Sequence, residues 1–228
     1  TAFTTAAQAL SAPNSVDITT DADLVQEYTG YTSGLWTFGA CQYVPGNMVG
    51  QSYFIMLNQY DDPGVTNNWS TQVLFDVAAG LVVDTGLSGT TLPLTVDQWV
   101  PLEVQIDLTQ DIQNFYYGGV LLYTSDWTNH VSGGGIFNIG ALDLFANGAT
   151  SVYYDDLSLT AGFNTVECTE GEPSIEINKT VGTVPGVCAT TDDIVVPAGG
   201  GGTDVYYCYD VMNTGTVTLT HHDLDDSE

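Results

Sequence analysis

Stretches in which apolar and polar residues alternate recur along the first two thirds of the chain. In residues 99–108, Leu102, Val104 and Ile106 alternate with polar residues, so an extended strand there has one apolar and one polar face. Similar runs, each bounded by turn residues, lie at 15–20, 52–60, 70–78, 114–124 and 151–160. No stretch shows a convincing helical period. Strands at this spacing predict an all-β fold, a sandwich or jelly roll.

The pattern changes after residue 160. Residues 161–173 show no periodicity and carry Glu, Gly and Pro, which is typical of a linker. Strand signals resume at 174–181, 192–198, 204–213 and 216–224. We therefore expect a jelly-roll domain over 1–162, a linker over 163–173 and a second β module over 174–228. About 55 residues with four strand signals are few for an independent sandwich, so this module is expected to be incomplete.

The composition narrows the function classes. The chain has 43% hydrophobic residues, enough for a core, but no apolar run long enough for a membrane span. Lys179 is its single basic residue against 28 acidic ones, for a net charge of -27. Such a chain repels nucleic acids and anionic membranes, and its natural partners are cations such as Ca²⁺ or Mg²⁺, or basic proteins. The alternative is that the acidity serves solubility only. The N-terminus has no basic region and so is not a signal peptide; a secreted protein would already have lost its own.

Four cysteines fit an oxidising compartment. No CxxC pair or suitably spaced His supports a zinc site. Cys188 and Cys208 belong to one small module, and a disulfide between them closes a loop that stabilises by roughly 3 kcal/mol. Cys41 and Cys168 are then partners by elimination. The alternative is that one or both bond to another chain.

Two resemblances extend this interpretation. Residues 9–160, with SAPNSVDI (11–18), WTFGACQY (36–43), QWVPLEVQIDL (98–108) and DLFANGATSVYYDDLSL (143–159), resemble a concanavalin-like or laminin-G-like jelly-roll module of bacterial surface proteins. Such modules usually begin with one or two further strands, which implies that Thr1 is a cleavage point or a boundary within a longer protein.

The second resemblance covers residues 173–228. PSIEINKTVG (173–182), CATTDDIVVPAG (188–199) and VYYCYDVMNTG (205–215) are similar to the opening of the DUF11-type Ig-like repeat. This family implies a spacer or matrix role and continues for several more strands. The chain is thus expected to be part of a longer protein, or to receive missing strands from a neighbouring subunit.

Calcium is the expected ligand. The jelly-roll resemblance implies that an Asp near the last strand, Asp155 or Asp156, holds a structural Ca²⁺ through hard oxygen ligands. Asp61 and Asp62, in a Gly/Pro/Asn loop, are weaker candidates, as is the acidic C-terminal cluster. None matches the EF-hand pattern. The alternative at each position is a solvated turn carboxylate.

Lys179 raises the possibility of a covalent cross-link. Some Ig-like domains of bacterial surface proteins form a Lys–Asn isopeptide bond, and the resemblance implies Asn213 as partner, with Asp210 or Asp223 as the assisting acid. That chemistry needs a desolvated, neutral amine. The competing interpretation is an ordinary solvent-facing lysine that forms an ion pair with Glu176.

The residues that could carry catalysis do not form a complete motif. Glu103, Gln105 and Asp107 superficially resemble the E-x-D-x-x-E motif of concanavalin-like glucanases, but Gln occupies the middle position, and GxSxG is absent. We therefore expect no catalysis. Trp69 and Trp127 lie in loop-like contexts and are the candidates for stacking on a glycan; core positions are the alternative. Asn68 and Asn178 begin glycosylation sequons.

The expected function is that of a structural subunit or segment of an extracellular surface, matrix or filament protein, which self-associates or adjoins further domains. The alternative is a calcium-dependent glycan-binding adhesin, and an acidic glycan hydrolase comes third.

Overall fold

The computed structural model describes residues 2–61, 66–171, 174–195, 202–215, 219, 221 and 223–225. The chain divides into two compact units, Thr1–Glu170 and Gly171–Glu228. Most of the segment that the sequence analysis assigned to a linker, residues 163–170, therefore belongs to the first unit. The described residues of both units are extended or irregular, which confirms the all-β prediction. Among them, no helix is long and apolar enough to cross a bilayer.

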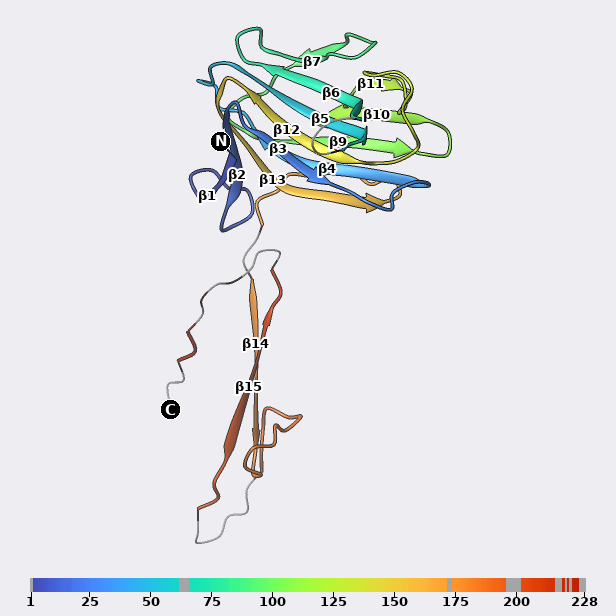
Figure 1. The fold of residues 1–228 in the computed structure, drawn as a ribbon. Coiled ribbons are helices and arrows are strands. Elements are labelled where there is room, and N and C mark those ends of the chain that lie inside the picture. The colour runs from blue at the N-terminus through green and yellow to red at the C-terminus, as the bar shows by residue number, and fades with distance from the viewer. Residues whose placement is uncertain are drawn as a thin grey trace. The chain divides into compact units, whose positions relative to one another are not determined.

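The first unit is a sandwich of two antiparallel sheets (Figure 1). The seven-stranded sheet has the order β1 (Ala2–Thr5), β2 (Ser15–Thr20), β13 (Ala149–Ala161), β4 (Leu35–Tyr43), β9 (Trp99–Asp107), β10 (Ile112–Tyr117) and β11 (Val120–Ser125). The six-stranded sheet has the order β3 (Asp23–Glu27), β12 (Ala141–Asn147), β5 (Gln51–Gln59), β6 (Asn68–Asp76), β7 (Leu81–Asp84) and β8 (Thr91–Pro93). Several neighbouring strands are far apart in the sequence, such as β2 and β13 or β4 and β9, as expected for a jelly roll.

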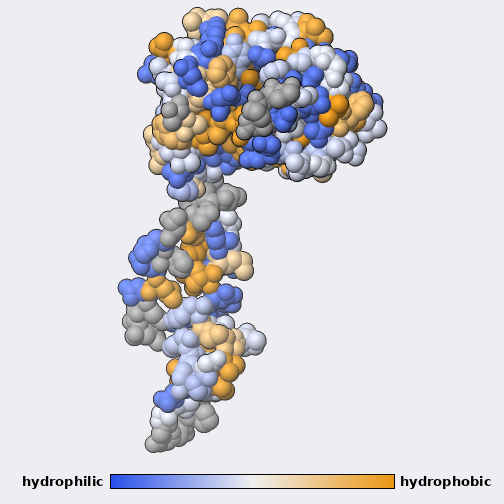
Figure 2. Space-filling view, in the orientation of Figure 1, coloured by the Kyte–Doolittle hydropathy of each residue, from blue (hydrophilic) through white to orange (hydrophobic). Residues whose placement is uncertain are grey.

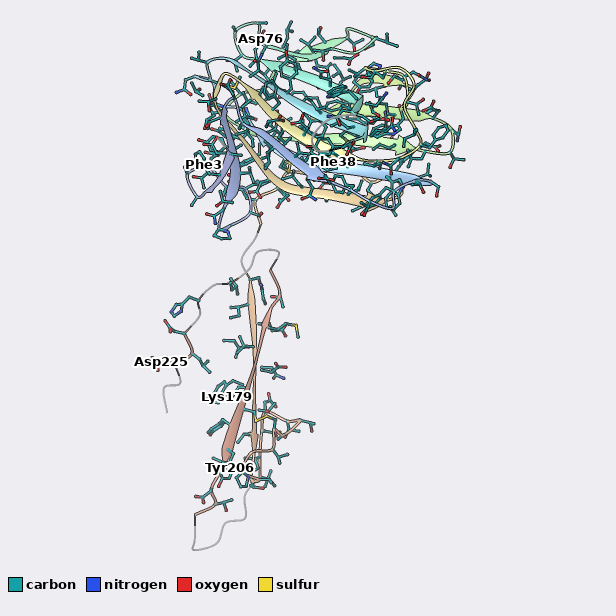
Figure 3. The ribbon with its side chains drawn as sticks, in the orientation of Figure 1. Phe3, Phe38, Asp76, Lys179, Tyr206 and Asp225 are labelled. Carbon is teal, nitrogen blue, oxygen red and sulfur yellow. A yellow bond between two sulfur atoms is a disulfide. The ribbon has the colours of Figure 1, made fainter. Side chains whose placement is uncertain are left out.

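One core fills the space between the sheets. Leu102, Val104 and Ile106 of β9 are fully buried, as their alternation predicted. Phe38 of β4 lies in this core (Figure 3) and packs against Phe54 of β5, with ring centroids 5.7 Å apart. Aromatic pairs of this kind bury much area and fix the distance between the sheets.

One predicted strand is in fact a hairpin. Residues 114–124 were expected to form a single run, but β10 ends at Tyr117 and β11 begins at Val120. Gly118 and Gly119 form the turn, with φ angles of 58° and 75°. Two successive positive φ angles are characteristic of a two-residue hairpin loop, and glycine adopts them without a steric penalty.

A disulfide joins Cys41 of β4 to Cys168, as predicted. It holds the segment that follows β13 against the outer face of the seven-stranded sheet. There Glu103 accepts hydrogen bonds from the Val166 backbone N–H (3.1 Å) and the Gln105 side chain (2.8 Å). Asp107 accepts from the backbone N–H groups of the β9–β10 turn. Glu103 and Asp107, the carboxylates of the glucanase-like motif, therefore accept hydrogen bonds from backbone N–H groups and from the Gln105 side chain.

The second unit contains one two-stranded antiparallel sheet among its described residues. β14 (Ile175–Gly182) pairs with β15 (Tyr206–Asn213) (Figure 1). The predicted disulfide joins Cys188 to Cys208. The run predicted at 192–198 is not a strand over its described residues, 192–195. Most of the run at 216–224 lies outside the described residues. The Ig-like type of this module stays a prediction.

Candidate functional site on the outer face of the six-stranded sheet

The six-stranded sheet has a second apolar cluster on the face turned away from the core. Ile55 and Leu57 of β5 and Ala141 of β12 are buried there, with 6%, 2% and 0% of their surface exposed. Partly buried apolar side chains surround them: Val25, Tyr53, Tyr60, Trp69 and Phe145. The solvent-facing side of a sheet normally carries polar residues. A buried apolar cluster on that side therefore distinguishes it from a surface with scattered exposed apolar residues.

The register of the strands places these residues in three rows across the sheet. In the first row, Asp23 of β3, Phe145 of β12 and Tyr53 of β5 lie side by side. The second row contains Val25, Asp143, Ile55 and Gln72. The third row contains Glu27, Ala141, Leu57 and Trp69. Aromatic rings therefore stand at both ends of the buried patch, with one aspartate in its middle.

The aromatic groups have the geometry of a stacking surface. The rings of Tyr53 and Phe145 are stacked, with centroids 6.1 Å apart and an angle of 28° between their planes. Trp69 lies in β6 and not in a loop, and its ring is partly exposed and packs on the same cluster. Rings held in place by neighbouring side chains lose little conformational entropy when a ligand binds to them.

Asp143 and Asp23 form a carboxyl pair within this face. Asp143 is directly opposite Val25 and Ile55 and shares its strand face with Ala141 and Phe145. Burial in these apolar surroundings, the hydrogen bond with Asp23 and the charge of Asp23 raise the pKa of Asp143 to about 8. Its Oδ1 atom is buried and has no hydrogen-bond partner. Near neutral pH the pair therefore holds one proton.

A polar cavity adjoins the third row. Its volume is about 410 Å³, and its lining includes Glu27, Gln59, Tyr60, Asp61 and Asn138. Glu27 also belongs to the third row, and Gly140, which precedes Ala141, lines the cavity too, so apolar face and cavity are continuous. A cavity of this size with carboxylate, amide and phenol groups suits a small polar ligand.

The charge of this unit limits what can bind. Residues 1–170 contain no Lys or Arg, because the one basic residue is Lys179. The unit's His130 lies buried, with its Nε2 atom 2.8 Å from the Asp84 carboxylate. An anionic ligand would meet carboxylates and no cationic partner, which is unfavourable in a protein of net charge -27.

Two predicted positions are corrected by their burial. Trp127 is fully buried, and its indole N–H donates to the Asn138 carbonyl oxygen at 2.9 Å, so its ring is part of the core and offers no stacking surface. Asn68 is also buried; its side chain accepts from Asn58 Nδ2 at 2.7 Å and donates to the Gly133 carbonyl at 3.0 Å. Asn68 is therefore no glycosylation site in the folded protein, whereas Asn178 is exposed on β14.

The aspartates expected to bind calcium lie apart. Asp155 is buried and accepts hydrogen bonds from the backbone N–H groups of Leu10 and Ser11 and from the Ser11 hydroxyl, so it anchors that segment. Asp156 also accepts from Ser11. Asp61 lines the polar cavity with Glu27, and Asp62 lies outside the described residues. Across the described part of the chain, no three His, Cys, Asp or Glu side chains form a metal-binding group. Calcium binding stays a prediction.

The isopeptide hypothesis is not supported by the strand register. Lys179 pairs with Tyr209, whereas Asn213 pairs with Ile175, four residues away. At about 3.3 Å per residue, this separates the two backbones by roughly 13 Å along the strand. The Lys179 ammonium lies 4.2 Å from the centroid of the Tyr207 ring instead. Asp210 lies on the opposite face, and the exposed Asp223 contacts His221.

No family of known proteins and no curated protein matches the sequence. Its fold is similar to solved structures. One is an endo-β-1,4-glucuronan lyase from the fungus Trichoderma reesei, with 12% identity over 72% of this chain and 87% of that chain, and a TM-score of 0.49. Another is the carbohydrate-binding module CBM66 from Bacillus subtilis, with 14% identity over 64% and 86% and a TM-score of 0.41. A third is a sialidase, with 7% identity over 65% of this chain, a TM-score of 0.48, and only 15% of the sialidase covered.

These likenesses concern the fold, because every identity is below 25%. The sandwich of the first unit is seen in its own two antiparallel sheets, and the comparisons do not bear on the DUF11-type repeat. They contradict the expectation that the chain is not an enzyme, since a lyase and a sialidase are among the proteins of similar fold. We therefore withdraw that expectation.

Proposed function

We propose that the first unit binds neutral glycans on the outer face of its six-stranded sheet. The observation that carries this proposal is the aromatic surface of Tyr53, Phe145 and Trp69, fixed over the buried residues Ile55 and Leu57. The C–H faces of a pyranose ring are apolar and pack on aromatic rings, while its hydroxyl groups need polar partners at the edge. The adjoining cavity and the carboxyl pair supply such partners.

The preference for neutral sugars follows from charge. Binding a uronic or sialic acid requires a cation near its carboxylate, and residues 1–170 have no Lys or Arg. A metal ion bridging the ligand to Glu27 or Asp61 is the route by which the predicted calcium would take part. Two disulfides are typical of secreted proteins, which meet such glycans outside the cell.

The test is a titration of the full chain with neutral and uronic-acid oligosaccharides, measured by calorimetry with and without a calcium chelator. Trp69→Ala and Tyr53→Ala should each weaken binding of a neutral oligosaccharide by about tenfold, or ~1.4 kcal/mol. The matched control is Trp99→Ala, since Trp99 is also partly buried and packs on Tyr43 in the other sheet. Equal losses in the Trp69 and Trp99 variants, or tighter binding of uronic acids without calcium, would contradict the proposal.

A second candidate function is assembly into an extracellular structure. It is favoured by the sheet β14–β15, whose one face carries the exposed side chains of Ile175, Ile177 and Tyr207. Figure 2 shows hydrophobic residues at the surface of the second unit. Both outer edges of the sheet lack a partner strand among the described residues. We propose that a second copy of the chain binds to this face and these edges, and that Ca²⁺ offsets the repulsion between two chains of net charge -27. Electron microscopy should show polymers that disperse on chelation; dispersed particles under both conditions would exclude this function.

A further inference from the structure

Asp143 differs from Asp155 and Asp84 in that no backbone or cationic partner is found for it among the described residues. Asp155 accepts backbone hydrogen bonds, and Asp84 is paired with His130. Asp143 has Val25 and Ile55 opposite it, and its buried Oδ1 atom has no hydrogen-bond partner. A carboxyl group in apolar surroundings is disfavoured in its charged form, so this environment favours the protonated form of Asp143.

The carboxyl pair of Asp23 and Asp143 lies next to the stacked rings of Tyr53 and Phe145. Asp23 is exposed and lies directly opposite Phe145, which lies opposite Tyr53. A sugar ring lying on the Tyr53–Phe145 stack would therefore have its edge, where the hydroxyl groups are, beside the Asp23 carboxylate. Asp143 stands diagonally to Asp23 on the neighbouring strand, at a distance that the two side chains span with a hydrogen bond.

We propose that Asp23 is the residue that accepts the hydroxyl hydrogen bonds of a neutral sugar, and that Asp143 positions it by donating a hydrogen bond to its carboxylate. This inference rests on the proposed glycan binding and adds its specificity-determining residues. A carboxylate that accepts from two neighbouring hydroxyl groups distinguishes sugars by the positions of those hydroxyls. It also rejects an acidic sugar, because two carboxylates repel each other.

Glycan binding should therefore weaken as Asp143 loses its proton, because repulsion between the carboxylates of Asp143 and Asp23 then replaces their hydrogen bond. The other titratable groups near Asp143 do not reverse this. Glu27 shares its sheet face from β3 and adds negative charge, and Tyr53 of β5 brings no positive charge. Tyr154 of β13 is fully buried in the core, and Asp17 of β2 bonds to Ser151 on the far face of the other sheet.

The experiment measures the affinity of the full chain for the neutral oligosaccharide from about pH 6 to about pH 9. Wild type should lose about tenfold in affinity over this range. Asp143→Asn keeps an N–H donor but does not titrate, so it should bind with a flat profile. Asp143→Val lacks the donor and should bind weakly at every pH. The control Asp21→Asn, at an exposed position just before β3, should keep the wild-type profile.

A second readout needs no ligand. The carboxyl carbon of Asp143, followed by NMR in the free protein, should titrate well above the range of an ordinary aspartate, and Asp23→Asn should lower that midpoint. An ordinary midpoint for Asp143 would overturn the inference. A flat pH profile of wild-type binding, or an Asp143→Asn profile like that of wild type, would also overturn it. If binding still depended on Tyr53, the proposed function would stand. Absence of neutral-glycan binding at every pH would remove both proposals.

Discussion

The two units use the same β-structure but differ in what holds it together. The first unit buries a continuous core between two sheets, with Phe38, Phe54 and Phe115 fully covered. The second unit, among its described residues, has one two-stranded sheet, of which Val181 alone belongs to the buried apolar residues. An isolated two-stranded sheet is marginally stable in water, so its disulfide matters far more. A disulfide therefore supplements a hydrophobic core in the first unit and takes the place of one in the second.

The largest effect is expected from removing core volume in the first unit. Phe54 is fully buried and packs on Phe38 and Phe115, with ring centroids 5.7 and 5.8 Å away. Phe54→Ala should therefore lower the free energy of unfolding by about 3–5 kcal/mol. Urea unfolding followed by tryptophan fluorescence reports this unit alone, because all four tryptophans lie in it. Phe3→Ala, at a position that is 48% exposed, is the control and should change stability little.

Removing the Cys188–Cys208 disulfide should destabilise the second unit by about 3 kcal/mol, because the loop it closes gains freedom in the unfolded state. The measurement is hydrogen exchange of β14 and β15 amides in Cys188→Ser/Cys208→Ser, where protection should be lost. In Cys41→Ser/Cys168→Ser, the amides of β4 and β9 should stay protected, because the core holds them. Protected β15 amides without the disulfide would show that the comparison between the units is wrong.

The stability of the first unit should depend on Asp143. Its pKa is raised from 3.8 to about 8, so the folded state binds this proton more tightly than the unfolded state does. The stabilisation is fully present below about pH 4 and is lost as pH rises through about 8. At alkaline pH, the free energy of unfolding of Asp143→Asn should therefore exceed that of wild type by about 1 kcal/mol. The difference is this small because solvent screens the charge of the exposed Asp23. Thermal unfolding at several pH values measures this; parallel curves for both proteins would contradict it.

Local patterns predicted much of the first unit, and long-range pairing explains most of what they missed. The alternation in residues 99–108 gave β9 and its buried face, and the positions of Cys188 and Cys208 gave a correct disulfide. The hairpin at Gly118–Gly119 could have been found from the glycine pair.

The carboxyl pair could not be predicted in this way. Asp23 and Asp143 are far apart in sequence and meet only because β3 pairs with β12, a register that no local pattern specifies. The one available signal was the apolar run 53–57, in which both faces of β5 are hydrophobic and both are in fact covered. Trp127 was misjudged for a related reason: its turn is buried under other segments, and turn residues alone do not show this.

The smallest expected effect concerns how much a single side-chain contact stabilises the second unit. The ammonium of Lys179, which is labelled in Figure 3, lies 4.2 Å from the Tyr207 ring centroid and 5.5 Å from that of Tyr209. Cation–π contacts at exposed sites stabilise by about 0.5–1 kcal/mol, and Tyr207 is 41% exposed. Lys179→Met keeps the apolar stem and removes the charge, so hydrogen exchange of β15 amides should report a loss of that size.

A double-mutant cycle of Lys179→Met with Tyr207→Leu separates this contact from others that Lys179 makes, because only the coupling between the two changes measures the pair. Glu176→Gln, on the opposite face of β14, should show no coupling with Tyr207. A coupling well above 1 kcal/mol would mean that Lys179 is desolvated in solution. The apolar face of β14–β15 would then be covered by a partner, and the second unit would resemble the first in having a core, one that is shared between chains.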